Sequence, residues 1–175
     1  KSATNCQARN AVFRCKFLNG KYGVISVNWN SLDQWIWYCL FENCKYSIDL
    51  CVGDFQIYGN VFLNSQVYDI GGGNTYQSAV VNNTSFNSPC FFQKGPGYLR
   101  GNKIYTDVDS FYTVGAQMID NIFRNGNTQY PVQRIAGVNI VGAQTLMVGN
   151  TYSTSHRNYP FGWPVQPTMQ NFDHA

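Results

Sequence analysis

The most constraining feature of this sequence is a structural unit that occurs twice in succession within residues 35–73. Each copy contains an alternating run, a corner that carries asparagine, and a second alternating run, as in WIWYCLFENCKYSIDLCVG and FQIYGNVFLNSQVYDIGGG. Three positions define our alignment of the copies: Phe41 with Phe62, Asn43 with Asn64, and Asp49 with Asp69. Direct recurrence of one unit indicates a repeat protein, in which each unit packs on the next.

Weaker copies of the unit flank this pair on both sides. An aromatic residue marks one position of each copy, at Phe17, Phe41, Phe62, Phe86, Tyr105, Phe123 and Tyr152. Most intervals between these markers are 18–24 residues, and no helical pattern lies between them. Stacked coils bring like residues into columns. The sequence therefore predicts an all-β parallel β-helix with an interior aromatic column.

A second column follows two residues after the aromatic marker. It consists of asparagines that lie at a corner of the coil, at Asn19, Asn43, Asn64 and Asn125. Asparagine tolerates the left-handed backbone conformation and bonds to local backbone groups, as such a corner requires. Stacked asparagine side chains also bond from one coil to the next.

Composition excludes several classes of function. The net charge is only +3 and the chain has no run of lysine or arginine, which argues against a nucleic-acid surface. No apolar stretch approaches the roughly 20 residues needed to cross a bilayer. Cys15 and Cys39, two of six cysteines, share a column of the repeat, and the sequence leaves open whether they are free thiols or a disulfide.

The second run of each coil predicts a polar stripe on one sheet face. Alternation places Ile25, Val27, Ile48, Leu50, Tyr68 and Ile70 inside, and therefore Ser26, Asp49, Asp69 and Gln93 outside. Two carboxylates one rung apart suit the acid and nucleophile of a retaining glycosidase. They also suit a Ca²⁺ ion completed by an acidic polysaccharide. In that case Lys94 or Arg100, one coil further on, is the candidate base for a lyase.

A solvated pair of surface carboxylates is the competing interpretation of Asp49 and Asp69. Among the tryptophans, Trp29 follows a strand and lies between two asparagines, which makes it the preferred platform for a sugar ring. Trp35 and Trp37 alternate with Ile36, and either core packing or sugar stacking fits them. The candidate substrate-binding residues are therefore Ser26, Trp29 and Gln93.

Coil length, the aromatic column and the asparagine column together resemble the pectate-lyase-like superfamily of right-handed parallel β-helices. Its members include polysaccharide lyases, polygalacturonase-type hydrolases and phage tailspikes. The resemblance implies a right-handed solenoid of about 7–8 coils over residues 1–153, with an irregular tail over residues 154–175. The helix that usually caps such a solenoid at its N-terminus is absent, so we expect further coils or domains before Lys1.

The resemblance also implies a function class. We expect an exported protein, extracellular, periplasmic or at the cell surface, that handles polysaccharide as a lyase or a glycoside hydrolase. No catalytic signature of those enzymes matches, so their residues are not carried over. The alternative is a non-catalytic solenoid that binds carbohydrate, such as an adhesin or a tailspike-like stem.

Overall fold

The computed structural model describes residues 7–27, 31–50, 53–72, 77–93, 97–108, 110–115, 117–126, 132–137 and 146–154. These residues form nineteen strands and no helix. The first sheet, sheet A, has the strand order β1 (Gln7–Phe13), β4 (Ser31–Trp37), β7 (Asp54–Tyr58), β10 (Gln77–Val81), β12 (Gly97–Arg100), β15 (Gln117–Ile119) and β18 (Leu146–Val148).

Two further faces complete the coil. Sheet B contains β2 (Lys16–Leu18), β5 (Leu40–Glu42), β8 (Val61–Leu63), β11 (Thr84–Phe86), β13 (Lys103–Thr106), β16 (Ile122–Asn125) and β19 (Thr151–Thr154). The third face contains sheet C, of β3 (Tyr22–Ile25), β6 (Tyr46–Leu50) and β9 (Tyr68–Gly72), and a pair of β14 (Ser110–Gly115) with β17 (Val132–Gly137).

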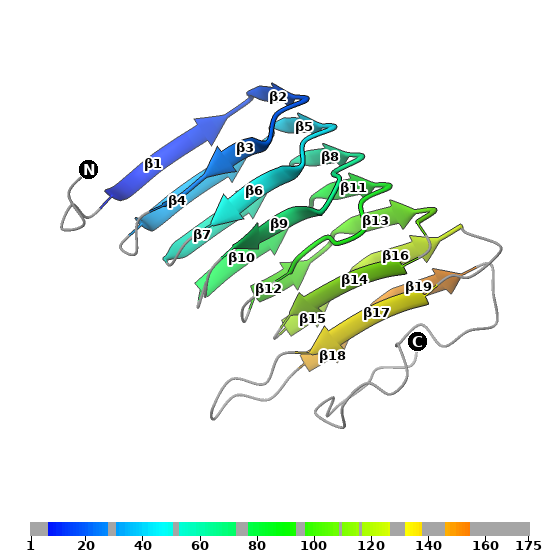
Figure 1. The fold of residues 1–175 in the computed structure, drawn as a ribbon. Coiled ribbons are helices and arrows are strands. Elements are labelled where there is room, and N and C mark those ends of the chain that lie inside the picture. Colours follow the sequence, from blue (N-terminus) through cyan, green and yellow to red (C-terminus); the bar gives the residue numbers. More distant parts are fainter. Residues whose placement is uncertain are drawn as a thin grey trace.

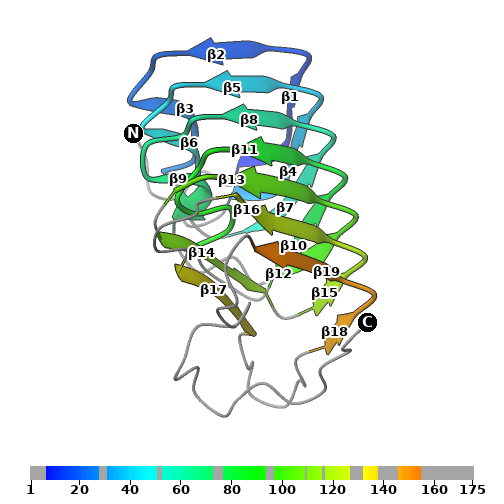
Figure 2. The ribbon, with the colours of Figure 1, turned by 90° about the vertical axis from the view of Figure 1, so that its right-hand side faces the viewer.

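Every strand pairing in these sheets is parallel, and successive coils lie on one another along the molecule (Figure 1). Figure 2 shows sheet B strands stacked in order from β2 to β19. The prediction of an all-β parallel solenoid is confirmed. The part of the chain that the structure describes contains no helix with the length and apolar character that a membrane crossing requires.

The corner between sheets A and B contains a buried asparagine ladder. Its members each follow a residue with positive φ, and they are Asn60, Asn83, Asn102, Asn121 and Asn150. Asn102 donates from Nδ2 to the Val80 carbonyl at 2.8 Å and to Asn121 Oδ1 at 2.9 Å. Its Oδ1 accepts from the backbone and side-chain nitrogens of Asn83 at 2.9 and 3.0 Å. Each coil therefore satisfies the polar groups of its neighbour, as buried amides require.

The opposite corner of sheet B contains the asparagine column that the sequence predicts. Asn19, Asn43, Asn64 and also Asn87 have φ between 53° and 59°, in the left-handed region. Asn43 donates to Asn19, and Asn64 to Asn43, both at 3.3 Å. This column lies nearer the solvent than the buried ladder, and its bonds are longer. The predicted role of asparagine at this corner is confirmed for Asn19, Asn43 and Asn64.

The interior aromatic column is confirmed at Phe17, Phe41, Phe62 and Phe123, the last of which is buried and pairs with Ile104 of the same inward row. Phe17, Phe41 and Phe62 stack with ring centroids 4.9 and 5.2 Å apart and interplanar angles of 11° and 16°. The prediction is wrong for Phe86 and Tyr105, because Ser85 pairs with Phe62 and Ile104 follows it in the column. Phe86 instead stacks on Tyr105 at 5.4 Å on the outer face of sheet B.

Four cysteines in the described residues, Cys15, Cys39, Cys44 and Cys90, are free thiols. Cys39 occupies the position that asparagine holds in later coils, and its thiol contacts the Val12 carbonyl at 3.6 Å. Thr154, the first residue of the predicted tail at 154–175, ends β19 and pairs with Asn125. The rest of that tail, and residues 1–6, lie outside the described residues, as does the expectation about an N-terminal cap.

Candidate functional site

The predicted polar stripe is not a single outer surface. Tyr46 pairs with Tyr68 and Asp49 with Gly71, so Asp49 and Asp69 do not share a register position. The cause is the corner after Asn64, which is one residue longer than the corner after Asn43. The prediction that Asp69 points outward is wrong, because its side chain is 0% exposed.

Asp69 lies instead in a buried polar cluster that spans neighbouring coils. Ser65 and Ser88 each donate to Asp69 Oδ1 at 2.6 Å, and Ser85 donates to Oδ2 at 2.5 Å. Ser47, on the preceding coil, bonds to Ser65 at 2.7 Å. Burial raises the pKa of Asp69 to about 7, against the three hydroxyl contacts, which lower it. Ser85 replaces phenylalanine in the aromatic column where it meets this carboxylate.

The other predicted catalytic residues are not brought together. Asp49 is partly exposed on β6 of sheet C. Desolvation and a hydrogen bond to Asp49 raise the pKa of Tyr68. Arg100 ends β12 on sheet A, where its Nε lies 4.0 Å from an oxygen of Asp120. Lys94 lies outside the described residues.

The predicted binding residues are also separated. The facing predicted for the first coil is wrong, because Ile25 and Val27 are exposed while Val24 packs against the core. Ser26 is half-buried next to them, and Gln93 follows Phe92, with its backbone N–H donating to the Ile70 carbonyl. Trp29 lies outside the described residues. Among the residues that the structure describes, no three His, Cys, Asp or Glu side chains gather to hold a metal ion.

A different set of residues forms a site, on the outer face of sheet A. The inward row of this sheet includes Val12, Ile36, Ile57 and Val80, which are paired across successive strands. The next position therefore faces outward on every strand, and Phe13, Trp37, Tyr58 and Val81 form a column there. Two residues earlier, a parallel outer column contains Ala11, Trp35, Gln56 and Ala79.

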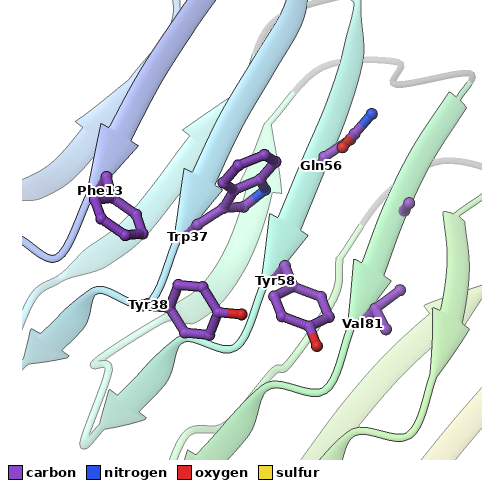
Figure 3. Close-up of a pocket in the computed structure, with 7 residues that line it drawn as sticks. Phe13, Trp37, Tyr38, Gln56, Tyr58 and Val81 are labelled. Atoms are coloured by element: carbon purple, nitrogen blue, oxygen red, sulfur yellow. The ribbon is translucent and has the colours of Figure 1, made fainter.

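These columns enclose an aromatic groove of about 490 Å³. We use that name for the hollow lined by Phe13, Trp37, Tyr38, Gln56, Tyr58, Ala79 and Val81 (Figure 3). The bulky rings come from β1, β4 and β7 and from Tyr38, which directly follows β4. β10 supplies the smaller side chains of Ala79 and Val81, which leave the space open. A volume of this size is within the range of small-molecule binding sites.

The rings of the groove are held by one another. Tyr38 packs edge-on against Phe13 at 5.9 Å and against Tyr58 at 5.4 Å. Its hydroxyl points toward Tyr58 (Figure 3). Desolvation, and after it a hydrogen bond with Tyr58, raises the pKa of Tyr38. Asn82 donates to the Tyr58 hydroxyl at 3.3 Å. Phe13 and Tyr38 are nevertheless 48% and 50% exposed, so their surfaces are available to a ligand.

The two tryptophans of β4 add unused hydrogen-bond donors. Trp35 and Trp37 stack at 5.5 Å with an interplanar angle of 17°. Among the described residues, neither indole N–H has a hydrogen-bond partner, although both nitrogens are shielded from solvent. Shielded donors without partners are uncommon in folded proteins and call for an explanation such as a ligand or ordered water.

The sequence indicates this site through the alternation of Trp35, Ile36 and Trp37. The alternation places Trp35 and Trp37 together on one face of the strand. It does not say whether that face or the face of Ile36 is turned toward the core. The structure assigns Ile36 to the core, at 2% exposure, and both tryptophans, half-buried, to the outer face of sheet A.

Comparison with family models, with curated proteins and with solved structures gave no match for this chain. The fold and the groove therefore define the class without help from relatives. The protein is a parallel β-solenoid whose outer face bears an aromatic groove.

Proposed function

We propose that this solenoid binds polysaccharide in the aromatic groove of sheet A. The observation that carries the proposal is a column of outward-facing rings on successive strands, in which Phe13 is exposed and Trp37 and Tyr58 are half-buried. Sugar rings present C–H faces that pack on aromatic rings and hydroxyls that bond to amides, phenols and indoles. The outer columns continue along the solenoid, so an extended chain can lie along them.

Binding of a panel of polysaccharides, measured by affinity electrophoresis and calorimetry, tests this function. Trp37→Ala removes the central ring of the groove, and we expect it to abolish most of the binding. Phe86→Ala is the matched control, because Phe86 is an aromatic residue 39% exposed on the outer face of sheet B. Equal binding by wild type and Trp37→Ala would reject the groove as the binding surface.

Catalysis by a lyase or glycoside hydrolase stays a prediction of the sequence. Asp49 is its best-placed residue, because it is partly exposed and bonded to Tyr68. Release of reducing ends, or of unsaturated product with and without Ca²⁺, by wild type but not by Asp49→Asn would support it. If the wild type is inactive on every substrate, the prediction of catalysis is wrong and only the binding function remains.

Three further expectations from the sequence also stay predictions: the handedness, the number of coils and the location of the protein. A right-handed sense and about 7–8 coils follow from the resemblance to pectate-lyase-like proteins. Export to the cell surface, periplasm or medium would place a polysaccharide-binding protein where its ligand is found. Secretion of a tagged chain from its host, followed by cell fractionation, tests that location.

A further inference from the structure

The chemistry of the groove lining narrows the class of sugar. None of the seven lining residues carries a charge, and their polar groups are two phenols, an indole and the amide of Gln56. A uronate or a sulfated sugar brings an anion that needs a cation or several donors to offset its desolvation. Hydroxyl groups need only the neutral donors and acceptors that these side chains supply.

Two arginines lie near the groove, and each contacts another side chain. The Arg14 guanidinium lies over the Phe13 ring, 4.9 Å from its centroid. Arg100 follows Val81 in the outer column, but it lies 4.0 Å from the Asp120 carboxylate. Both arginines are at the ends of the groove, and the space between them is lined by uncharged side chains.

The register also sets the direction of a bound chain. The lining residues occupy equivalent positions on β1, β4, β7 and β10, so the groove runs across the strands and along the solenoid axis. Four parallel strands span about 14 Å between the first and the last, at the usual strand spacing. This length accommodates a short segment of a sugar chain rather than a single ring.

Resting on the proposed function, we propose that the ligand of the aromatic groove is an uncharged polysaccharide lying along the solenoid axis. Gln56 is the residue best placed to report on charge, because it is exposed in the middle of the lining. Gln56→Lys and Gln56→Glu are matched variants that remove the same amide and introduce opposite charges. Both should leave the fold intact, because position 56 faces solvent.

The test measures dissociation constants for neutral and uronic-acid oligosaccharides of increasing length, at low and high salt. Wild type should bind neutral chains at least tenfold more tightly than uronic-acid chains of equal length. Its affinity for neutral chains should not change with ionic strength, since no ion pair is formed. Affinity should rise with length and level off once the chain exceeds the groove.

The two Gln56 variants should weaken neutral binding equally and differ on the acidic series. Gln56→Lys should gain affinity for uronic-acid chains, and that gain should fall with salt, while Gln56→Glu should bind them least. Stronger wild-type binding of acidic chains that depends on Trp37 would overturn the uncharged ligand but preserve polysaccharide binding in the groove. Absence of Trp37-dependent binding to any sugar would overturn the proposed function itself.

Discussion

The buried asparagine ladder and the aromatic groove both belong to sheet A, where the ladder follows β7 and later strands and the groove covers β1 to β10. In the ladder the polar side chains are fully hydrogen-bonded, whereas in the groove some are not. Inside, Asn102 has each of its side-chain groups bonded to an adjacent coil. Outside, the Trp35 and Trp37 indoles have no partner among the described residues. Polar groups that the coils satisfy among themselves stabilise the solenoid, whereas the shielded indole donors add no such bond, and the rings that carry them present their outer faces to a ligand. Variants of the two regions should therefore separate stability from binding.

The largest effect is expected from the interior ladder. Asn102→Ala leaves the Val80 carbonyl, the Asn83 amide and Asn121 Oδ1 each without a bond they now make. Several buried polar groups lose partners, so the free energy of unfolding should fall by roughly 4 kcal/mol. Urea denaturation measures this loss. Sugar affinity of the molecules that remain folded should not change, and a specific loss of affinity would contradict the separation.

A second effect of the interior depends on pH. The pKa of Asp69 is raised from 3.8 to about 7, so the folded protein holds this proton more tightly than the unfolded chain. The stabilisation is complete below about pH 4 and is lost as pH rises through about 7, roughly 2–3 kcal/mol of it between pH 5 and pH 8. Urea denaturation over that range measures the slope.

Asp69→Asn should flatten this slope, because an amide does not titrate. Its oxygen can accept from Ser65 and Ser88 as Oδ1 does now, while its NH₂ group would donate to the Ser85 hydroxyl, which reverses that bond. Asp120→Asn, at a surface carboxylate, is the control and should retain the wild-type profile. An unchanged slope in Asp69→Asn would show that the buried carboxylate does not carry the pH dependence.

Outside, Trp37→Ala should affect binding rather than stability. Loss of the central ring should weaken the polysaccharide at least tenfold, which corresponds to about 1.4 kcal/mol. Calorimetry gives the affinity, and urea denaturation of the same sample should show a much smaller change than Asn102→Ala. A loss of stability as large as that of Asn102→Ala would mean that Trp37 is part of the core.

The smallest effect is expected at the outer asparagine column. Asn43→Gly keeps the left-handed conformation that φ of 53° requires and removes only long, partly solvated bonds. The free energy of unfolding should change by no more than about 0.5 kcal/mol. A loss comparable to that of Asn102→Ala would show that the two asparagine columns stabilise the coils equally.

Much of the architecture could be predicted from the sequence, because stacked coils repeat their residue types. The corner asparagines and the stack from Phe17 to Phe62 follow directly from that repeat. It was harder to predict whether each side chain points into the core or outward, because a corner that gains one residue shifts the register of the strand after it. Because of this shift, the predicted outward direction of Asp69 was wrong. The predicted inward position of Phe86 was wrong because Ser85 occupies the place of the aromatic residue in that coil.

The site was harder to predict than the fold. Alternation pairs Trp35 with Trp37, but it does not say which of two faces is inside, and only the neighbouring strands decide that. The predicted acidic stripe failed as a surface because burying Asp69 is tolerated when three serine hydroxyls surround it. Those serines come from two coils, and no local pattern reveals their convergence.

The most direct test of sugar binding in the aromatic groove is an NMR titration. The indole N–H signals of a ¹⁵N-labelled sample are recorded while a neutral oligosaccharide is added. Trp35→Phe and Trp37→Phe assign the two signals of β4. We predict that both signals shift in proportion to bound sugar, while the backbone amide signals of Phe86 and Tyr105 on sheet B do not. Unchanged Trp35 and Trp37 signals under conditions in which the sugar binds would place the site elsewhere and contradict the account.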